Sequence, residues 1–374
     1  MKIVCDKSLL TSGIGISLRA IPSKSTMQIL SFIAIVAEDN KVRLVSNNLE
    51  LGIETELDAN VIEGGKICVE ARMFSEIVKK LPNNEITMEV NDDTNSDSGI
   101  KNRTMLIKSG KVKFEIAVMS TDEFVFLPNF SGDENIEISH YDLKNIINQT
   151  EFSISDNENT KVMTGELFEI KGNNLRMVAL DGNRIAIRNH NLVKEYKDVR
   201  AIIPGKTLRE LSKIISDDIE KRVIIYFSDN HVTFKFDNTT VLSRLIDGNY
   251  YNVDKMLTDT HNLKVTVNKA EMLETVDRSL LLRRESDKKP IIFDIYDDHI
   301  NFSMKTSVGS MNEDIDVTKT GDDLKIGFNP KFMIDALKNI DSEEIDFYFI
   351  NPKSPCFIRD ESKSYIYLIL PINF

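Results

Sequence analysis

One pattern occurs three times along the chain and constrains its fold more than any other feature: a short β run leads directly into an amphipathic helix. Its copies are K-I-C-V-E-A-R-M-F-S-E-I-V-K-K-L (66–81), R-A-I-I-P-G-K-T-L-R-E-L-S-K-I-I (200–215) and L-K-I-G-F-N-P-K-F-M-I-D-A-L-K-N-I (324–340). Apolar residues recur at every third or fourth position, which is the spacing of a helix with one buried face. Equivalent positions lie about 130 residues apart, the size of a domain. The pattern therefore predicts a triplicated domain and not a short-period solenoid.

A second unit of the same kind precedes each of these copies. It is recognisable at 136–147 and 263–276, and at the N-terminus it begins with a strand at 2–5 and a helix at 7–20. Each domain is therefore predicted to be α+β, with two βαβββ half-units and two helices packed against sheet. The other elements predicted for the first domain are strands at 29–37, 41–46, 50–57, 66–70, 85–90, 104–108 and 111–118, and a helix at 71–81 that Pro82 ends.

The repeat predicts three domains, at 1–128, 129–257 and 258–374. Polar stretches follow both boundaries, N-F-S-G-D-E-N (129–135) and T-D-T-H-N (258–262). No apolar run reaches the roughly 18 residues of a membrane span, and Asp6 interrupts the N-terminal apolar run that a signal peptide would need. The three cysteines are far apart and odd in number, so we expect buried, reduced thiols in a cytoplasmic protein.

Positive charge is concentrated in the predicted helices. The chain has a net charge of −12, which by itself argues against nucleic acid, because phosphate binding needs positive potential. The six predicted helices nevertheless carry +7 together, so the rest of the chain carries −19. One interpretation is a surface of helices that faces a polyanion. The other is that Lys and Arg simply favour the solvated faces of helices.

No group of residues has the spacing of a catalytic or metal site. The five histidines form no H-x-x-x-H pair, and the chain has no G-x-S-x-G elbow and no P-loop. The G-x-G of Gly13 and Gly15 lacks the third glycine and the downstream acid of a dinucleotide site. We therefore predict a non-catalytic protein that uses no metal and no cofactor. The alternatives are a metal-dependent nuclease or other phosphoryl-transfer enzyme, and a scaffold without DNA contact.

Four stretches spread over the whole chain resemble the bacterial sliding clamp, the β subunit of DNA polymerase III. S-T-M-Q-I-L (25–30) resembles the family's first loop, and V-A-L-D-G-N-R-I-A-I (178–187) resembles its second-domain D-G-x-R motif. S-R-L-I-D-G-N-Y-Y (243–251) resembles the segment that leads into the interdomain linker, and Y-L-I-L-P-I-N-F (367–374) resembles the apolar terminus with its proline. Several independent motifs in the same order make the resemblance specific.

The resemblance implies a head-to-tail homodimer in which six similar domains close a ring, with helices lining the hole and sheets outside. Duplex DNA would pass through the hole and be contacted at its backbone, without base readout, and the ring would tether the replicative polymerase for processivity. Lys24 matches a DNA-contacting loop position of the family. From the helix charge, the further DNA-facing candidates are Arg72, Lys79, Lys80, Lys206, Arg209, Lys213, Arg278, Lys331 and Lys338.

The resemblance also implies a hydrophobic groove between domains 2 and 3 that binds a short Gln-Leu-Phe-type motif. Its partners in the family are the polymerase alpha subunit, the clamp loader, other polymerases and repair proteins. An ordinary C-terminal core strand is the alternative for 365–369. The groove residues carried over by motif are Met163, Leu180, Gly182, Arg184, Ile185, Tyr251, Met256, Pro355, Leu368, Leu370, Pro371 and Ile372.

Three places depart from the better-known enterobacterial pattern of the groove. Leu180 and Asn183 stand where that pattern has Thr and His, and Tyr251 stands where it has Pro. The chain ends in Ile-Asn-Phe instead of Met-Arg-Leu. The groove is still expected to be apolar, and these departures bear on its preference among partners.

Two apolar stretches match the family's subunit contact. Phe114 and Ile116 lie on a predicted edge strand of domain 1, and Leu281 and Leu282 lie on a predicted helix of domain 3. The alternative is that both stretches belong to ordinary cores. An exposed edge strand needs pairing or cover, which the edge of a second copy would supply.

Overall fold

The structure is a computed structural model of the 374-residue chain, in which residues 1–82, 84–92, 103–128, 135–284 and 289–374 are described. The chain folds into two compact units: unit 1 is Met1–Tyr141 with Lys213–Leu245, and unit 2 is Asp142–Ser212 with Ile246–Phe374. The division passes through α3 (His140–Asn148) and α4 (Gly205–Ile214), so the middle repeat contributes to both units. Most of the polar stretch predicted to follow the first domain boundary lies outside the described residues.

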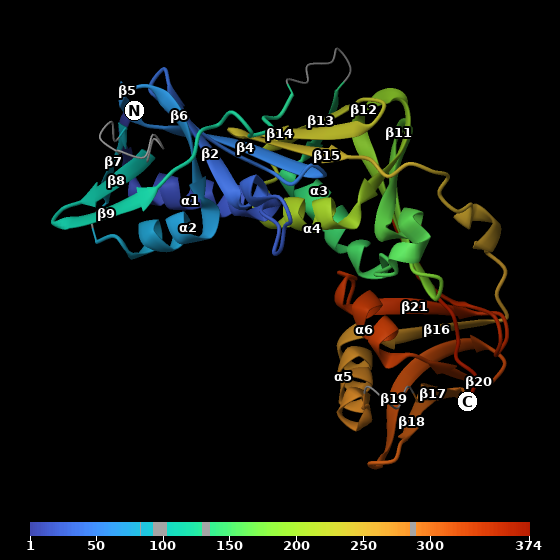
Figure 1. The fold of residues 1–374 in the computed structure, drawn as a ribbon. Coiled ribbons are helices and arrows are strands. Elements are labelled where there is room, and N and C mark those ends of the chain that lie inside the picture. The colour runs from blue at the N-terminus through green and yellow to red at the C-terminus, as the bar shows by residue number, and fades with distance from the viewer. Residues whose placement is uncertain (83, 93–102, 129–134, 285–288) are drawn as a thin grey trace. The chain divides into compact units, whose positions relative to one another are not determined.

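Unit 1 contains two antiparallel sheets, and its helices α1 (Lys7–Ser17) and α2 (Ala71–Lys80) lie side by side (Figure 1). The strand orders are β5-β1-β7-β8-β9 and β10-β13-β14-β15-β4-β3-β2-β6. The 3-10 helices are η1 (Leu18–Ala20) and η2 (Gln28–Ser31). The strands are β1 (Lys2–Asp6), β2 (Phe32–Glu38), β3 (Lys41–Asn47), β4 (Leu51–Asp58), β5 (Asn60–Glu63), β6 (Gly65–Glu70), β7 (Glu85–Asp92), β8 (Arg103–Ser109), β9 (Val112–Ala117), β10 (Ile136–Ser139), β13 (Arg222–Phe227), β14 (His231–Phe236) and β15 (Thr239–Arg244).

Unit 2 is built on a ten-stranded sheet with the order β11-β12-β23-β22-β21-β16-β19-β18-β17-β20. Its helices α5 (Lys269–Ser279) and α6 (Pro330–Lys338) lie side by side (Figure 1). The 3-10 helices are η3 (Glu151–Ser153), η4 (Glu158–Thr164), η5 (Val253–Met256) and η6 (Leu280–Leu282). The strands are β11 (Gly165–Leu180), β12 (Arg184–Pro204), β16 (Leu263–Asn268), β17 (Ile291–Ile295), β18 (His299–Lys305), β19 (Ser310–Gly321), β20 (Leu324–Phe328), β21 (Glu344–Phe349), β22 (Cys356–Arg359) and β23 (Tyr365–Ile369).

The predicted α+β triplication is confirmed by the order of these elements. A strand, a helix and three strands follow one another in each half-unit, from β1-α1-β2-β3-β4 at the start to β20-α6-β21-β22-β23 at the end. In the middle repeat, β11 and β12 are long because each serves as two consecutive strands. The first part of β11 pairs with the last part of β12, and the last part of β11 pairs with the first part of β12.

Several element bounds differ from those predicted. The predicted strand at 29–37 begins only at Phe32, because residues 28–31 form η2, and the helix predicted at 7–20 ends at Ser17 and continues as η1. Strand β5 was not predicted. It is short and mostly exposed, and it forms by pairing with β1, a long-range contact that local sequence pattern does not encode.

Side chains just before the helices fix where they start. Asp6 accepts hydrogen bonds from the backbone N–H groups of Ser8 and Leu9 at 2.7 and 3.1 Å, and Glu70 caps α2 in the same way. Asn329 caps α6, whose first residue is Pro330. These caps satisfy N–H groups that the first helical turn leaves unpaired, and each typically stabilises a helix by about 1 kcal/mol. The starts of α1, α2 and α6 are therefore fixed in the same way, by a polar side chain at the position just before the helix.

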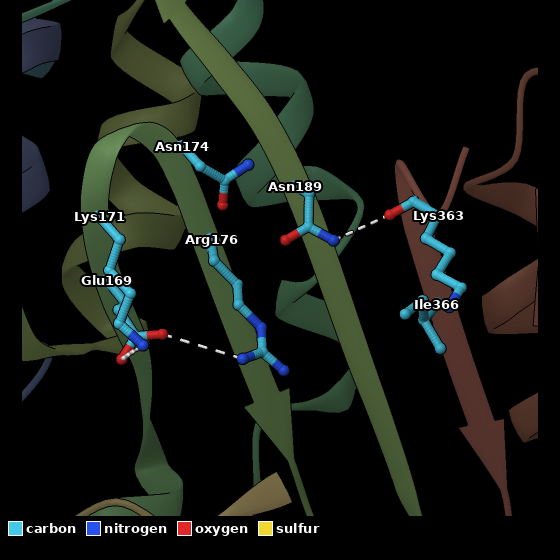
Figure 2. A pocket seen from close by; sticks show the side chains of 7 residues that line it. All are labelled: Glu169, Lys171, Asn174, Arg176, Asn189, Lys363 and Ile366. Atoms are coloured by element: carbon cyan, nitrogen blue, oxygen red, sulfur yellow. Dashed lines mark hydrogen bonds and ion pairs between the residues drawn. The ribbon is translucent and has the colours of Figure 1, made fainter. Parts of the chain in front are cut away.

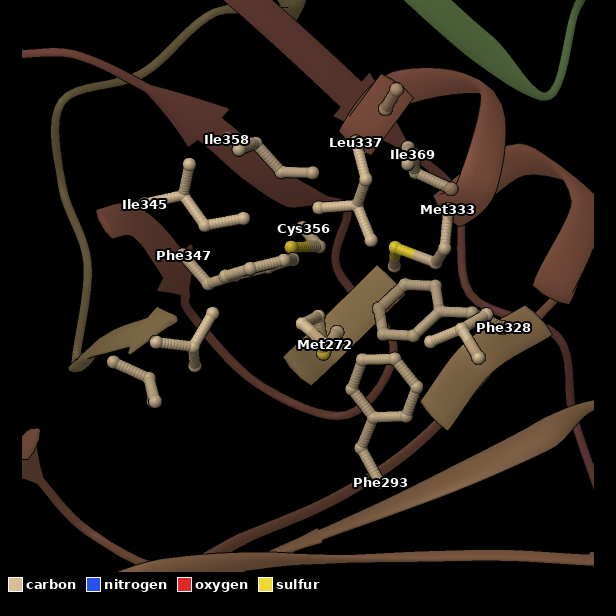
Figure 3. Close-up of a cluster of buried hydrophobic side chains, with 14 of the residues drawn as sticks. Met272, Phe293, Phe328, Met333, Leu337, Ile345, Phe347, Cys356, Ile358 and Ile369 are labelled. Atoms are coloured by element: carbon tan, nitrogen blue, oxygen red, sulfur yellow. The ribbon is translucent and has the colours of Figure 1, made fainter. Parts of the chain in front are cut away.

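The main core of unit 2 is rich in aromatic rings (Figure 3). Phe293 packs edge-to-face against Phe302 and Phe328, with ring centroids 4.7 and 5.2 Å apart. Met272 from α5 and Met333 from α6 are fully buried in the same cluster. The cluster therefore fixes both helices on the sheet, and each fully buried apolar side chain contributes about 1.5–3 kcal/mol of transfer free energy.

The three cysteines are free and buried, as the sequence predicted. Burial raises the pKa of Cys5 and of Cys68 to about 12, and it raises the pKa of Cys356 as well. The thiolate form is therefore suppressed at neutral pH, and these side chains act as small core residues.

Replacing Tyr367 with Phe should destabilise unit 2. The Tyr367 hydroxyl is buried and lies 3.0 Å from the carbonyl oxygen of Gln149 and 3.2 Å from that of Asn339, so it links the end of α3 to the end of α6. Its removal leaves these carbonyls without that donor and should cost about 1–3 kcal/mol. Chemical denaturation would measure the change. Tyr365→Phe, which removes a hydroxyl from the same face of β23, is the matched control and should cost less.

Candidate functional site

Strands β11, β12 and β23 present one continuous apolar face, called the apolar face below. The register sets Leu180 opposite Ile185 and Ile185 opposite Leu368, so three residues predicted for the groove come together in one row. The neighbouring row on the same face follows two residues along each strand. The apolar face consists of Leu180, Ile185, Leu368, Val178, Ile187 and Ile366, all buried in one cluster.

The segment 246–257 covers part of the apolar face. Tyr250 is buried there and donates a hydrogen bond from its hydroxyl to the carbonyl oxygen of Val178 at 3.0 Å, and Met163 packs against the same cluster. Three other residues predicted for the groove are exposed: Tyr251 is 43% accessible, Met256 50% and Leu370 38%. Large apolar side chains that stay this accessible beside an apolar cluster are available to a ligand.

Arg184 was predicted to line the groove, but the structure turns its side chain to the opposite face of β12 from Ile185. It forms ion pairs with Asp181 at 2.9 Å and Asp335 at 2.6 Å, and its guanidinium lies 4.4 Å from the ring centroid of Phe332. Successive side chains on a strand point to opposite faces, which is why Arg184 and Ile185 lie on different sides of β12. Arg184 therefore joins the turn after β11 to α6.

The turn between β11 and β12 and the chain terminus complete the groove candidates. Gly182 is exposed and has a φ of +89°, a conformation that favours glycine. The backbone N–H of Leu370 donates to the carbonyl oxygen of Asn183 at 2.9 Å, so the two segments run together. Pro371 and Pro355 are half-buried, Pro355 directly before β22.

Ile372 was also predicted for the groove, but the structure places it against another strand. Its backbone N–H donates to the carbonyl oxygen of Gly327 in β20 at 2.8 Å. A Cβ added at Gly327 would lie 2.8 Å from Cδ1 of Phe374, so the tail packs closely against Gly327, where a larger side chain would clash. The last residues thus leave the apolar face and follow β20.

The basic residues predicted to face DNA are exposed on the surface, except that Arg209 is half-buried. In unit 1, the Arg72 guanidinium donates to the carbonyl oxygen of Pro22 at 3.4 Å, which brings the loop of Lys24 next to α2. Arg278 is engaged differently. Its Nε donates to a carboxylate oxygen of Glu313 at 2.9 Å, its Nη2 also bonds Glu313, and these bonds raise its pKa.

The four residues predicted for the subunit contact have different surroundings. Phe114 lies on β9, at the edge of its sheet, and is 39% exposed, but Ile116 is part of the unit 1 core. Ile116 is therefore a core residue, the alternative stated for it. Leu281 is 83% exposed on η6, while Leu282 is half-buried.

A buried carboxyl group for which no role was predicted lies at the start of β11. Glu166 is fully buried, and burial raises its pKa to about 8. The hydroxyl of Thr150 lies 2.8 Å from both a Glu166 carboxylate oxygen and the carbonyl oxygen of Ile146. A hydroxyl has one proton, so when it donates to Ile146, a protonated Glu166 supplies the second hydrogen bond. No sequence signal distinguishes Glu166 from an exposed strand residue.

The free energy of unfolding should therefore fall as the pH rises from about 4.5 to about 8. The folded state holds the Glu166 proton more tightly than the unfolded state, so the stability that it gives is complete below the lower value and lost toward the higher one. Glu166→Gln keeps a donor to Thr150 without a charge and should remove this component, on the order of a few kcal/mol at pH 8. Thermal unfolding across this pH range would measure it. The exposed Glu158→Gln is the control and should leave the slope unchanged.

Within the described residues, no group of three or more His, Cys, Asp and Glu side chains could hold a metal ion. In the same part of the chain, no helix is both long enough and apolar enough to cross a membrane.

Known proteins match this chain along its whole length. Three family models match in order: the DNA polymerase III beta subunit N-terminal domain at 1–128, its central domain at 137–252 and its C-terminal domain at 255–373. The beta sliding clamp of Staphylococcus aureus is 32% identical over 384 residues, which cover 100% of this chain and 99% of the relative.

Solved structures agree in fold. The putative DNA polymerase III beta subunit of Eubacterium rectale is 48% identical with a TM-score of 0.94, and the DNA polymerase sliding clamp of Bacillus subtilis is 32% identical with a TM-score of 0.94. In both comparisons the match covers 100% of this chain and 99% of the other. The chain therefore belongs to the family of DNA polymerase III beta subunits, the beta sliding clamps, which are processivity factors and not catalytic enzymes.

Proposed function

We propose that two copies of this chain join head to tail into a ring that encircles duplex DNA and tethers the replicative polymerase. The observation that carries the proposal is the pairing of third strands of half-units. Strand β4, the third strand of half-unit 1, pairs with β15, the third strand of half-unit 4. The first part of β12, which is the third strand of half-unit 3, pairs with β23, the third strand of half-unit 6. Each pair thus joins half-units that are three apart.

Half-units 2 and 5 are also three apart, but their third strands, β9 and β19, do not pair with each other within the described part of the chain. Both are therefore available to pair with a second copy. Among the strands that the structure describes, β9 pairs with β8 alone, and residues 310–316 of β19 pair with β18 alone. Open strand edges need a partner or cover. Continuing the rule pairs β19 of one copy with β9 of the next, and two such contacts would close six domains into a ring.

Charge on the two edges supports this pairing. Lys113 lies on β9 and Lys111 in the turn just before it, while β19 carries Asp314 and Asp316 on its open part. All four residues are exposed. Opposite charges across an antiparallel pair favour the correct register, and like charges in a wrong register disfavour it.

Inside the ring, the helices would face the DNA backbone. Exposed lysines on α2, α4 and α6 supply positive charge in a chain whose net charge is −12. Contacts to phosphate alone carry no sequence information, as a sliding protein requires. Retention on DNA would come from ring closure, the work would be done in the bacterial cytoplasm, and no cofactor would be involved.

The apolar face and its exposed neighbours would dock partner proteins through a Gln-Leu-Phe-type motif. Partners of this kind are the polymerase alpha subunit, the clamp loader, other polymerases and repair proteins. The sliding clamp of Bartonella birtlesii, 25% identical with a TM-score of 0.90, was solved bound to griselimycin, so a relative of the same fold takes a ligand. The exposed Tyr251, Met256 and Leu370 give anchor side chains an apolar surface, and methionine can adapt to different partners.

Ring closure is tested by the topology of the DNA. The protein, loaded onto nicked circular plasmid by a bacterial clamp loader with ATP, should co-elute with DNA in gel filtration at high salt. Cutting the plasmid once should release it, because a ring slides off an end. A monomer at micromolar concentration that associates equally with linear and circular DNA would overturn the proposal.

Neutralising helix lysines should weaken the electrostatic part of DNA association. Lys80, Lys206 and Lys331 are exposed on α2, α4 and α6. If they contact phosphates, the triple change to Gln should lower the slope of log affinity against log salt by about one for each lost contact. Fluorescence anisotropy with a short duplex would measure the slope. Lys305→Gln with Lys353→Gln, which removes exposed charge away from the helices, should leave it nearly unchanged.

A further inference from the structure

A polar pocket of about 280 Å³ opens on unit 2 at the end of the apolar face (Figure 2). Figure 2 shows its side chains coming from three neighbouring strands, with Arg176 on β11, Asn189 on β12 and Ile366 near the start of β23. Because Ile366 belongs to both, the pocket and the apolar face share a border. The complete lining is Glu169, Lys171, Asn174, Arg176, Asn189, Lys363 and Ile366.

The register shows that the pocket continues the apolar face. Arg176 is opposite Asn189, and it precedes Val178 and Leu180 by two and four positions, so all three side chains point to one side of β11. Four residues along a strand span about 13 Å. An extended peptide that is anchored at the Leu180 row and runs along the strands would therefore reach the pocket about four residues from its anchor.

The pocket carries more positive than negative charge. Glu169 is nearly buried and forms ion pairs with Lys171, Arg176 and Arg200, at 3.5, 3.8 and 2.8 Å. Arg176 also pairs with Asp254 of η5 at 2.7 Å, which ties the pocket to the segment that covers the apolar face.

The lysine on the other wall, Lys363, pairs with Asp259 at 2.8 Å, and Arg359 bonds the same carboxylate. Five basic side chains thus share three carboxylates around the pocket, a surplus of two positive charges. Lys171 and Lys363 keep 68% and 45% of their side-chain surface exposed, so both are accessible to an added anion.

We infer that this pocket binds an acidic side chain of the partner peptide, about four residues from the apolar anchor that sits on the apolar face. The inference rests on the proposed docking function, which it extends from an apolar motif to an acidic flank. Charge complementarity at such a site selects among partners more than it adds affinity. Apolar anchors would be common to all partners, whereas the acidic residue would distinguish them.

The test is fluorescence polarisation with three labelled peptides that share one Gln-Leu-Phe-type core. One has a neutral flank, one has Asp four residues before the anchor, and one has Asp four residues after it. One of the two acidic peptides should bind the wild type about three- to tenfold more tightly than the neutral peptide at low salt. The variant Lys171→Gln with Lys363→Gln should lose that gain while binding the neutral peptide as before. Lys305→Gln with Lys353→Gln removes the same charge elsewhere in unit 2 and should keep the gain.

The outcomes separate this inference from the function on which it rests. If the neutral peptide binds and neither acidic flank adds affinity, the pocket is not a peptide site, while docking on the apolar face stands. If the gain persists in the Lys171→Gln, Lys363→Gln variant, it is a general charge effect and the inference is wrong. If no peptide binds the wild type, the proposed docking function itself fails.

Discussion

Lys113→Pro is expected to convert the proposed dimer into a monomer without unfolding the chain. In the antiparallel pair of β8 and β9, Val118 donates its N–H to the carbonyl oxygen of Arg103, so alternate residues of β9 bond β8. The N–H of Lys113 belongs to the other set and points away from β8. Proline removes this donor and adds a ring at the open edge, where prolines are tolerated. Dimer affinity should fall on the order of 100-fold, about 3 kcal/mol.

Asp314→Pro makes the same change on the other edge. In the hairpin of β18 and β19, Thr306 donates its N–H to Gly309 at 2.9 Å, which by alternation directs the N–H of Asp314 outward. Sedimentation equilibrium would measure both variants, and circular dichroism would confirm that they fold. Lys113→Ala keeps the N–H and is the matched control, which should lose only the small contribution of the Lys113 charge. If both proline variants dimerise as tightly as the wild type, the subunits do not join through β9 and β19.

The Arg278 guanidinium is bound at this edge, to Glu313. It was a DNA-facing candidate because helix charge alone cannot show what a side chain binds. In the structure it holds Glu313, which lies on the open part of β19, and Thr275 donates to the same carboxylate at 3.0 Å. The ion pairs with Arg278 lower the pKa of Glu313. Arg278 thus joins α5 to the strand that the proposed dimer uses.

Repetition is why so much of the fold could be predicted from the sequence. The junctions into α1, α2, α5 and α6 use the same local signals, a capping side chain and a helix with one buried face, and these signals depend on neighbours only a few residues away. Strand β5 depends instead on its long-range pairing with β1, and no local pattern in the sequence predicts it. The same holds for the pairing of β4 with β15 and of β12 with β23, which joins successive repeats.

The candidate groove was predictable in part for a similar reason. Leu180, Ile185 and Leu368 come together because alternate positions of neighbouring strands share a face. Arg184 differs from Ile185 by one position, and that single step moves it to the other face, where two carboxylates hold it. Ile372 lies beyond Pro371, where the strand pattern ends, so only the observed hydrogen bond to β20 shows its direction.

Met256→Glu combined with Leu370→Glu should abolish binding of a Gln-Leu-Phe-type peptide while the chain stays folded. Both side chains are exposed, at 50% and 38%, so charge there does not enter a core. The two new carboxylates would have to be desolvated when a Leu or Phe anchor binds beside them. Losing burial of one such anchor costs about 1.5–3 kcal/mol, so the combined loss of affinity should reach about 100-fold.

Fluorescence polarisation measures this effect, and Val193→Glu is the matched control. Val193 is 94% exposed on β12, outside the apolar face, so its variant adds a carboxylate to the same sheet and should bind the peptide normally. Deleting 372–374 should have only a small effect, because Ile372 is held by β20 and not by the apolar face. Full affinity in the Met256→Glu, Leu370→Glu variant, or complete loss in the tail deletion, would move the docking site from the β11-β12-β23 face to β20. The two results therefore decide which of two surfaces reached by the C-terminal segment holds the anchors, the apolar face or the surface beside β20.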